Sequence, residues 1–176
     1  MALVFNERSA RLFKIIAVVY ILIVPVVILT PILHASHLCD SCAMFIHYVF
    51  KYSCHQSPFR SFFILDYKMP VCARCLSIHV GIALTFIYLW KKIGENRVDA
   101  KITLKRIGLI LLLIAPTAID GGTQYLGWRE STNIIRLILG FPAGVAYALA
   151  VFFGLGLAEK IVEKTKKKVW GIIPPS

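Results

Sequence analysis

The sequence predicts an all-α integral membrane protein with four transmembrane helices, and three observations support this prediction. Hydrophobic residues make up 58% of the 176-residue chain, whereas ordinary globular domains contain about 45–50%. Most of these residues are concentrated in four long blocks, as bilayer-spanning helices of about 20 residues require. The basic residues cluster at alternating ends of the blocks, which is typical of a chain that crosses a membrane repeatedly. We expect one domain over residues 1–176.

The four apolar blocks define the expected helices. They cover residues 12–33, 75–90, 107–119 and 134–158. The second and third are short unless their polar ends extend them, although a bilayer can thin around a short span. We interpret the first block as a retained helix, because it is too long for a signal peptide and contains Pro25 and Pro31.

Small residues and a polar residue mark the last block. Gly140, Gly144 and Ala148 recur at four-residue spacing, a pattern that lets helices pack closely in lipid. Ser131 precedes the block, and its hydroxyl could accept a hydrogen bond from a first-turn N–H group. We therefore predict Ser131 as the N-cap of the last helix.

The net charge of +11 would suggest a nucleic-acid partner in a soluble protein, but the positions of the charges favour a membrane topology. Fourteen of the 20 lysines and arginines precede the first block, separate the second from the third, or follow the fourth. They are Arg8, Arg11, Lys14, Lys91, Lys92, Arg97, Lys101, Lys105, Arg106, Lys160, Lys164, Lys166, Lys167 and Lys168. Since basic loops stay in the cytoplasm, both termini are expected there, in a multi-pass protein of the cell membrane. The basic tail 159–176 would contact anionic lipid rather than nucleic acid.

The segment between the first two blocks, residues 34–74, is then expected to be an extracytoplasmic cap, next to an outer loop at residues 120–133. All 5 cysteines and three histidines lie in or beside the cap. They are Cys39, Cys42, Cys54, Cys72, Cys75, His37, His47 and His55. Residues 43–52 have the spacing of an interfacial amphipathic helix, and residues 60–70 predict a short hairpin that delivers Cys72 and Cys75 to the second block.

One interpretation of the cysteines is a metal site. Cys72 and Cys75 are two residues apart, so both thiolates can face one ion, as in tetrahedral zinc sites. The other half of such a site could be Cys54 with His55, or the Cys-x-x-Cys at residues 39–42, which is more distant than usual.

The alternative interpretation is a set of disulfides, which persist in oxidising compartments. Five thiols would leave one unpaired. Haem attachment is excluded because neither Cys-x-x-Cys precedes a histidine. His79 follows Cys75 by four residues and is a spare ligand candidate, whereas His34 and His37 are expected to be interfacial residues.

A second set of polar residues surrounds the start of the last block. It comprises Asp120, Gln124, Arg129, Ser131, Asn133 and Arg136. Arg129 and Arg136 lie near a helix N-terminus, which attracts anions, and arginine binds phosphate in a bidentate fork. The expected anion- or lipid-binding residues are Arg60, Arg74, Gln124, Arg129, Asn133 and Arg136. The catalytic candidates are Asp120, Arg129 and Arg136. In the alternative, Asp120 pairs with Arg129 or Arg136 and only ties two loops together.

These motifs resemble the family of small predicted membrane proteins called domain of unknown function 2085, which occurs in archaea and bacteria. The resemblance covers about residues 45–150. The motifs are Cys54-His-Gln-x-Pro-Phe-Arg60-Ser-Phe, then Pro70-Val-Cys-Ala-Arg-Cys75-x-Ser-Ile-x-x-Gly81, then Asp120-Gly-x-x-Gln124-x-x-Gly127-x-Arg129-x-Ser131-x-Asn133-x-x-Arg136, followed by Gly140 and Gly144. The resemblance implies a metal set of Cys54, His55, Cys72 and Cys75. Cys39 and Cys42 lie outside the motifs, and His79 stands where the family has tyrosine.

The leading function hypothesis is a protein with an outward-facing zinc site that binds or acts on a phosphate-bearing lipid, with the bilayer and an anionic headgroup as partners and no nucleic acid. Zinc could polarise a phosphoryl oxygen or water, while Arg129 and Arg136 hold the anion. Four protein ligands, however, are typical of a structural zinc site.

One alternative is a thiol–disulfide oxidoreductase exchanging electrons between residues 39–42 and 72–75. Another is a non-enzymatic accessory subunit or transporter component.

Overall fold

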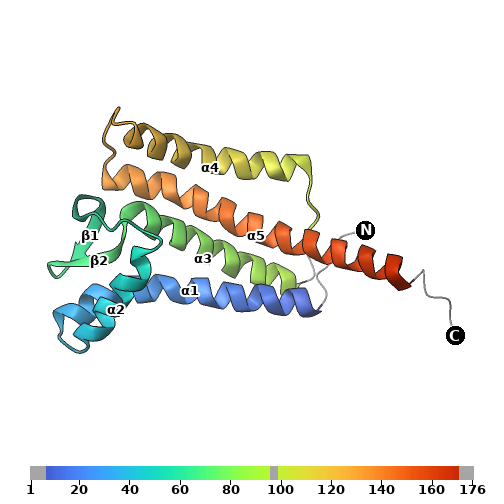
Figure 1. The fold of residues 1–176 in the computed structure, drawn as a ribbon, viewed down its shortest axis with the longest axis horizontal. Coiled ribbons are helices and arrows are strands. Elements are labelled where there is room, and N and C mark those ends of the chain that lie inside the picture. Colours follow the sequence, from blue (N-terminus) through green and yellow to red (C-terminus); the bar gives the residue numbers. More distant parts are fainter. Residues whose placement is uncertain (1–6, 96–98, 171–176) are drawn as a thin grey trace.

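The computed structural model of the chain describes residues 7–95 and 99–170, with side chains described as far as residue 166, and consists mainly of helices (Figure 1). The elements are α1 (Glu7–Ala35), α2 (Asp40–Lys51), the 3-10 helix η1 (Pro58–Arg60), β1 (Ser61–Ile64), β2 (Tyr67–Cys72), α3 (Ala73–Gly94), α4 (Leu104–Tyr125) and α5 (Asn133–Trp170). The prediction of a mainly helical fold is confirmed, and a two-stranded hairpin is the departure from an all-α fold.

Three of the described helices, α1, α3 and α5, are long and apolar enough to cross a membrane. The fourth predicted span, which corresponds to α4, stays a prediction. Each helix is longer than its predicted apolar block because polar residues extend it. The clearest case is α5, which continues to Trp170, so the predicted basic tail 159–176 is helical as far as the structure describes it.

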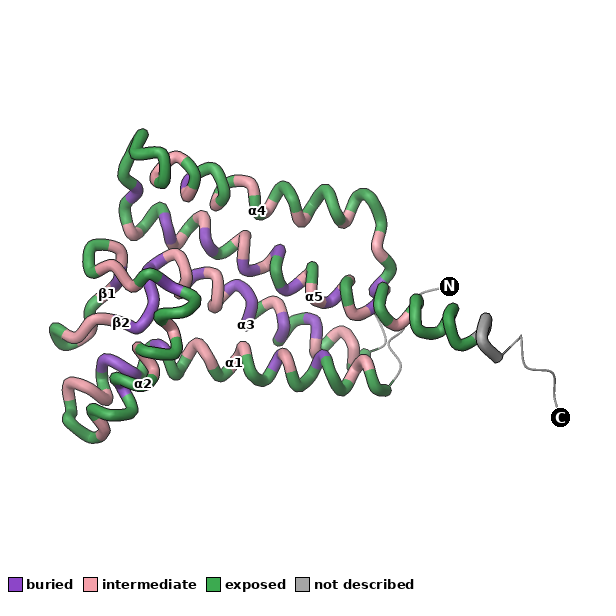
Figure 2. The backbone as a smooth tube through the Cα atoms, viewed as in Figure 1, coloured by how far each residue is buried: buried purple, intermediate pink, exposed green. Residues whose placement is uncertain are grey.

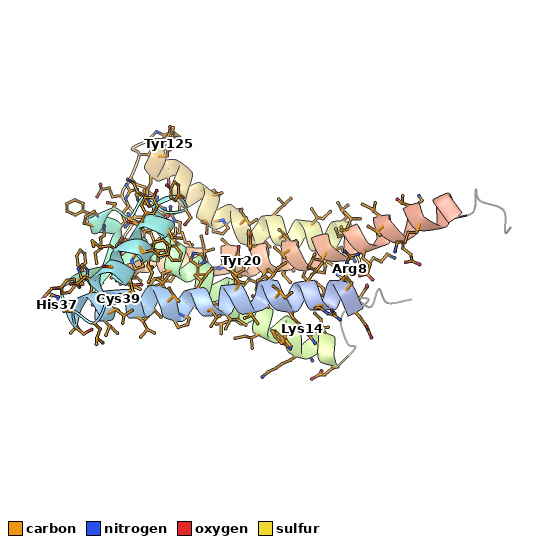
Figure 3. All side chains as sticks on the ribbon, turned by 60° about the horizontal axis from the view of Figure 1, so that its bottom comes forward. Arg8, Lys14, Tyr20, His37, Cys39 and Tyr125 are labelled. Atoms are coloured by element: carbon orange, nitrogen blue, oxygen red, sulfur yellow. A yellow bond between two sulfur atoms is a disulfide. The ribbon has the colours of Figure 1, made fainter. Side chains whose placement is uncertain are left out.

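The four long helices lie side by side in the order α4, α5, α3, α1 (Figure 1). The most extensive contact joins α3 to α5, while α1 packs on α3 and α4 packs on α5. The cap and the end of α4 lie at one end of the molecule. Figure 3 shows His37, Cys39 and Tyr125 at this end and Arg8 and Lys14 towards the other. The segments predicted to lie together on the outer side therefore do share one end.

Small residues allow the close contact between α3 and α5. A Cβ atom added to Gly81 of α3 would lie 2.5 Å from the carbonyl oxygen of Phe141, and one added to Gly144 of α5 would collide with the carbonyl of Ile78. Ala148 is fully buried in the same row. The predicted small-residue packing surface is confirmed, and α3 is the helix that it meets.

The core between α1, α3 and α5 is aromatic, whereas the outer faces of the helices are apolar and exposed. The rings of Phe13, Phe86 and Phe152 are buried, and Phe13 meets the other two edge-on at centroid distances of 5.3 and 5.7 Å. Figure 2 shows extensive exposure along α1 and α4, and the exposed residues there include Ile15, Val19, Leu111 and Leu112. Exposed apolar surface of this extent suits contact with lipid.

The cap is fastened to α1 by an apolar cluster. Val27 of α1 is buried against Met69 and Val71 of β2, and the same cluster contains Cys54 and Cys72. This packing places Cys54 and Cys72 next to the C-terminal half of α1. The helix predicted at residues 43–52 is observed as α2, and the predicted hairpin is observed as β1 and β2. The interfacial location of α2 stays a prediction.

The hairpin turns at Leu65 and Asp66, which both have positive φ angles of 52° and 64°. A two-residue turn with two positive φ values matches the right-handed twist of the flanking strands. The strands pair Ser61 with Cys72 and Ile64 with Tyr67. This register brings Cys72 to the start of α3.

The predicted N-cap of the last helix is wrong by one residue. The Thr132 hydroxyl accepts the N–H of Ile135 at 3.3 Å, because α5 begins at Asn133. Ser131 is buried, and its hydroxyl lies 3.5 Å from the Thr132 carbonyl oxygen. Ser131 therefore belongs to the loop and does not cap the helix.

Candidate metal centre and arginine pocket

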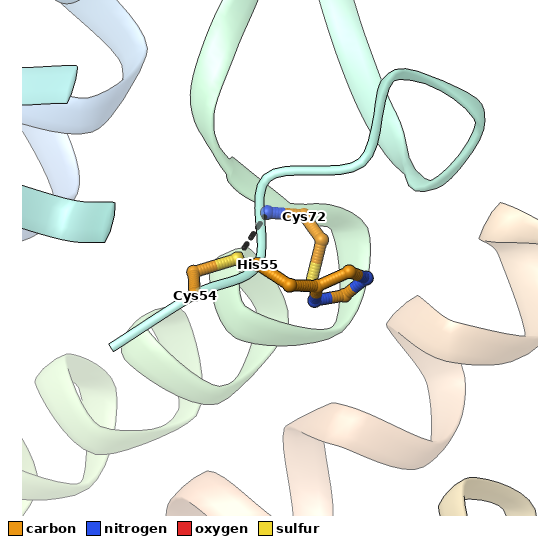
Figure 4. Close-up of side chains that lie close together, drawn as sticks. All are labelled: Cys54, His55 and Cys72. Carbon is orange, nitrogen blue, oxygen red and sulfur yellow. Dashed lines mark hydrogen bonds between the residues drawn. The ribbon is translucent and has the colours of Figure 1, made fainter. Parts of the chain in front are cut away.

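Three side chains from two parts of the cap, the segment after α2 and the end of β2, lie close together (Figure 4). One ligand atom from each of Cys54, His55 and Cys72 lies within 4.8 Å of the other two. Cys54 follows α2, where its N–H donates to the Phe50 carbonyl at 2.8 Å, while Cys72 ends β2 and is the N-cap of α3. The two cysteines are buried and His55 is exposed, so the group opens to solvent on the histidine side.

The donor set fits a zinc ion. Zinc binds sulfur at about 2.3 Å and nitrogen at about 2.0 Å in a tetrahedron, so a small contraction of this group would bring all three atoms into coordination. The Sγ of Cys54 accepts the N–H of Cys72 at 3.1 Å. Hydrogen bonds from the thiols of Cys72 and Cys75 lower the pKa of Cys54 to about 2, despite burial. The hydrogen bond with Cys54 raises the pKa of Cys72, so the group favours one thiolate, and metal binding would have to release the protons of the other thiols.

Cys75 is the fourth member of the predicted metal set and lies beside the three-residue group. Its thiol makes a hydrogen bond with the Cys54 sulfur, and it is half-buried in the first turn of α3. The group that satisfies the mutual distance of 4.8 Å contains Cys54, His55 and Cys72 alone among the residues that the structure describes. Cys75 is therefore close enough to complete a tetrahedron only after a local adjustment.

The remaining two cysteines, Cys39 and Cys42, form a disulfide. The disulfide interpretation therefore holds for this pair, while Cys54, Cys72 and Cys75 are free. His79, the spare ligand candidate, is outside the group of possible ligands. Its ring lies between Tyr20 and Phe50 at centroid distances of 6.4 and 6.0 Å, and its Nδ1 has no hydrogen-bond partner among the described residues.

Gln56 supports the group in a way that sequence reasoning missed. It has a positive φ of 49°, which reverses the chain directly after His55. Its Nε2 donates to the His47 carbonyl at 2.7 Å, and its own carbonyl accepts from Lys68 Nζ at 2.9 Å. The signal that could have identified it was the position of Gln56 inside the Cys-His-Gln motif.

Asp120 joins three segments at the end of the helices that carries the cap. Its carboxylate is buried, with 1% exposure, and it pairs with Arg74 of α3 and Arg129 of the following loop. The Nε2 of Gln124 also donates to it at 3.3 Å, and Gly121 leaves room for the Arg74 guanidinium. The expected tie between loops is present through Arg129, but the other partner is Arg74 and not Arg136.

Arg136 is the buried cation of the pocket. Its residue is 5% exposed, and Nη1 donates to Asn133 Oδ1 at 2.7 Å, while Nε has no hydrogen-bond partner within the described part of the chain. The charges of Arg60 and Arg74 act on it repulsively, whereas Asp120 and, to a smaller extent, Cys72 act on it attractively. We call Arg60, Arg74, Asn133 and Arg136 the arginine pocket. Its three arginines outnumber the one carboxylate, Asp120, that pairs with Arg74, and it adjoins the cysteine–histidine group.

Comparisons with known proteins match the part of the chain that contains both sites. A family model described as a predicted membrane protein, domain of unknown function 2085, matches residues 54–150. An uncharacterized protein of Methanothermobacter thermautotrophicus is 40% identical over 100 residues, which are 57% of this chain and 85% of the relative. One of Methanocaldococcus jannaschii is 39% identical over 126 residues, 69% of this chain and 74% of the relative. No solved structure matches the chain.

Proposed function

Because the chain belongs to the domain of unknown function 2085 family of predicted membrane proteins, we propose that it is a multi-pass protein of the cell membrane. In this proposal α4 is a fourth span beside α1, α3 and α5, and both termini are cytoplasmic. The cap faces outward and combines a zinc site with an anion pocket for a phosphate-bearing lipid. The distribution of basic residues supports the orientation.

The zinc would be held by Cys54, His55 and Cys72, with Cys75 as the fourth ligand. Zinc bound by three thiolates and one histidine closes its coordination shell, as structural sites do. It would fasten the chain after α2 to the junction of β2 and α3. Bound zinc supplies binding free energy that stabilises the fold, and with Cys75 displaced it would supply a Lewis acid.

The observation that carries the lipid proposal is the buried guanidinium of Arg136, whose Nε has no partner in the described residues. An unpaired buried cation costs several kcal/mol by order of magnitude, so a ligand that brings negative charge and acceptor oxygens would relieve this cost. Phosphate provides both in the geometry that guanidinium groups prefer. The pocket lies where the helices end, at the level expected for headgroups.

Titration calorimetry of the purified full chain in detergent tests this proposal, with short-chain phosphatidic acid as the probe. Arg136→Ala should weaken binding about 10- to 100-fold, since a charge-assisted hydrogen bond contributes about 1.5–3 kcal/mol. Lys51→Ala removes an exposed charge from α2 and should leave binding unchanged. Equal binding by Arg136→Ala and the unmodified protein would contradict the proposal.

Two further arms identify the source of the phosphate. Short-chain phosphatidylcholine, whose headgroup has no net charge, should bind more weakly than phosphatidic acid. Inorganic phosphate should compete only weakly if the acyl chains contribute by contacting the apolar outer faces of the helices. Tight, Arg136-dependent binding of inorganic phosphate alone would assign the pocket to the free ion instead of a lipid. Circular dichroism of each variant checks that the helices are intact.

A further inference from the structure

We propose that the Cys39–Cys42 disulfide is a redox-active pair that exchanges with a dithiol of another protein. It lies where α2 begins, at the end of the molecule that carries the cap (Figure 3). It is the one disulfide in the described residues 7–95 and 99–170, and it precedes the segment matched by the family model. The proposed metal site uses neither sulfur.

The pair is accessible to a partner. Cys42 is exposed and Cys39 is half-buried, and their neighbours His37, Leu38 and Asp40 are exposed. Leu38 has 78% of its surface exposed, and its side chain provides an apolar contact for a partner beside the disulfide. Thiol–disulfide exchange requires a thiolate to reach one sulfur of the bond, and Cys42 is the more exposed residue of the pair.

The structure of α2 favours Cys39 as the leaving group. Cys39 is the N-cap of this 12-residue helix, and its Sγ accepts the N–H of Cys42 at 3.2 Å. The unpaired N–H groups and the dipole of a helix N-terminus stabilise a thiolate. The Asp40 carboxylate in the same turn opposes this effect. It is contacted by His37 Nδ1 at 3.3 Å and His34 Nε2 at 3.9 Å.

The exchange has two steps. A thiolate of the partner attacks Cys42 Sγ, so that a mixed disulfide forms, the Cys39–Cys42 bond breaks, and the electron pair leaves on Cys39. The second thiolate of the partner then attacks the partner's other cysteine sulfur, which is bonded to Cys42 in the mixed disulfide, and Cys42 leaves as a thiolate. The partner dithiol is oxidised to a disulfide. Cys39 and Cys42 are reduced to thiols and take up the two protons that the partner thiols lost, and the reverse reaction restores the disulfide.

This exchange differs from the one between the two Cys-x-x-Cys motifs that the sequence suggested. Cys72 is buried and Cys75 half-buried beside Cys54, and these three thiols are free. The disulfide and the metal group thus have different environments within the cap. Cys42 is exposed at the start of a helix, whereas Cys54 and Cys72 are buried in an apolar cluster with residues of α1 and β2. An external protein dithiol is therefore the partner that fits Cys39 and Cys42.

The full chain in lipid nanodiscs tests the proposal, with reduced thioredoxin as the protein-dithiol probe. Incubation should cause loss of the Cys39–Cys42 disulfide and a gain of two alkylated cysteines, located by mass spectrometry, while the metal content is unchanged. A thioredoxin variant without its resolving cysteine should form a trapped mixed disulfide with Cys42. The double variant Cys39→Ser/Cys42→Ser should form no adduct and keep its helices and its metal.

Three results would overturn the proposal. The first is a disulfide that thioredoxin reduces only after the protein has been denatured. The second is a trapped adduct on Cys39, which would reverse the assignment of attacked sulfur and leaving group. The third is loss of metal from the double variant, which would make these cysteines ligands. Because the readout is the thiol state of Cys39 and Cys42, failure here is distinguishable from absence of zinc at Cys54, His55 and Cys72.

Discussion

At the scale of single residues, the pairing of charges decides how the arginines can act. Four arginines were expected to converge on an anion, and the structure pairs two of them with Asp120, because a buried carboxylate requires compensation. Arg136 is left with a neutral amide partner. Residue types and spacing were sufficient to identify this set from the sequence. The partners within the set were not predictable, because they depend on how α3 approaches α4.

Asp120→Asn should lower the free energy of unfolding by about 3 kcal/mol, because it leaves the charges of Arg74 and Arg129 without their carboxylate. The Arg129 side chain is 46% exposed, so solvent screens its share of the loss. Denaturant titration in detergent micelles measures the change. Glu130→Gln, an exposed carboxylate in the same loop, should change stability by less than about 0.5 kcal/mol, and equal effects of the two substitutions would refute the pairing argument.

Cys72→Ser should abolish metal binding and lower the melting temperature, since metal-binding free energy is folding free energy in such a site. Cys72 belongs to the three-residue group, and its backbone N–H also bonds Cys54. Cys75→Ser should weaken metal affinity less severely if Cys75 enters the site only after adjustment. Metal analysis and thermal unfolding measure both effects. A Cys72→Ser protein with full metal content would rule out the ligand assignment.

At the scale of elements, the apolar blocks predicted the helices, and the segment 60–70 predicted the hairpin. The helix ends were less predictable. Residues such as Lys91 and Lys92 continue α3 beyond its apolar block, because basic side chains are compatible with a helix C-terminus. The N-cap moved from Ser131 to Thr132 because both are good caps and the local loop geometry decides between them.

Gly144→Ala should destabilise the contact between α3 and α5 by about 1–3 kcal/mol, because the added methyl group would meet the backbone at Ile78 and neither helix can move freely. Gly154→Ala is the matched control in α5. It has open space around its Cβ position and should be neutral or stabilising by up to about 1 kcal/mol. Unfolding in micelles compares the two, and a harmless Gly144→Ala would mean that the helices are less closely packed than described.

At the scale of the whole molecule, the basic residues predicted which segments share an end, and the structure agrees for the cap and the end of α4. The sequence could not predict the lateral order of the helices, since every outer face is apolar and only small-residue packing distinguishes one neighbour from another. It also could not separate the disulfide from the metal group, because both use Cys-x-x-Cys motifs at helix starts.

The fourth span can be tested by labelling the two ends of α4. Tyr125→Cys and Leu104→Cys replace residues that are 92% and 84% exposed. In intact cells a membrane-impermeant maleimide should label Tyr125→Cys, and it should label Leu104→Cys only after permeabilisation, because in the proposed topology α4 crosses the bilayer with the cap outside. Labelling of both positions from one side would show that α4 lies on the surface, and the inverse pattern would reverse the orientation.

The most direct measurement of the central claim is the zinc content of the purified protein, combined with titration of its thiols before and after chelation. A single zinc ion per chain is expected, with Cys54, Cys72 and Cys75 protected from alkylation until the chelator removes the metal. Protein that contains no metal and whose three free cysteines react at once, or are joined to each other, would contradict the account.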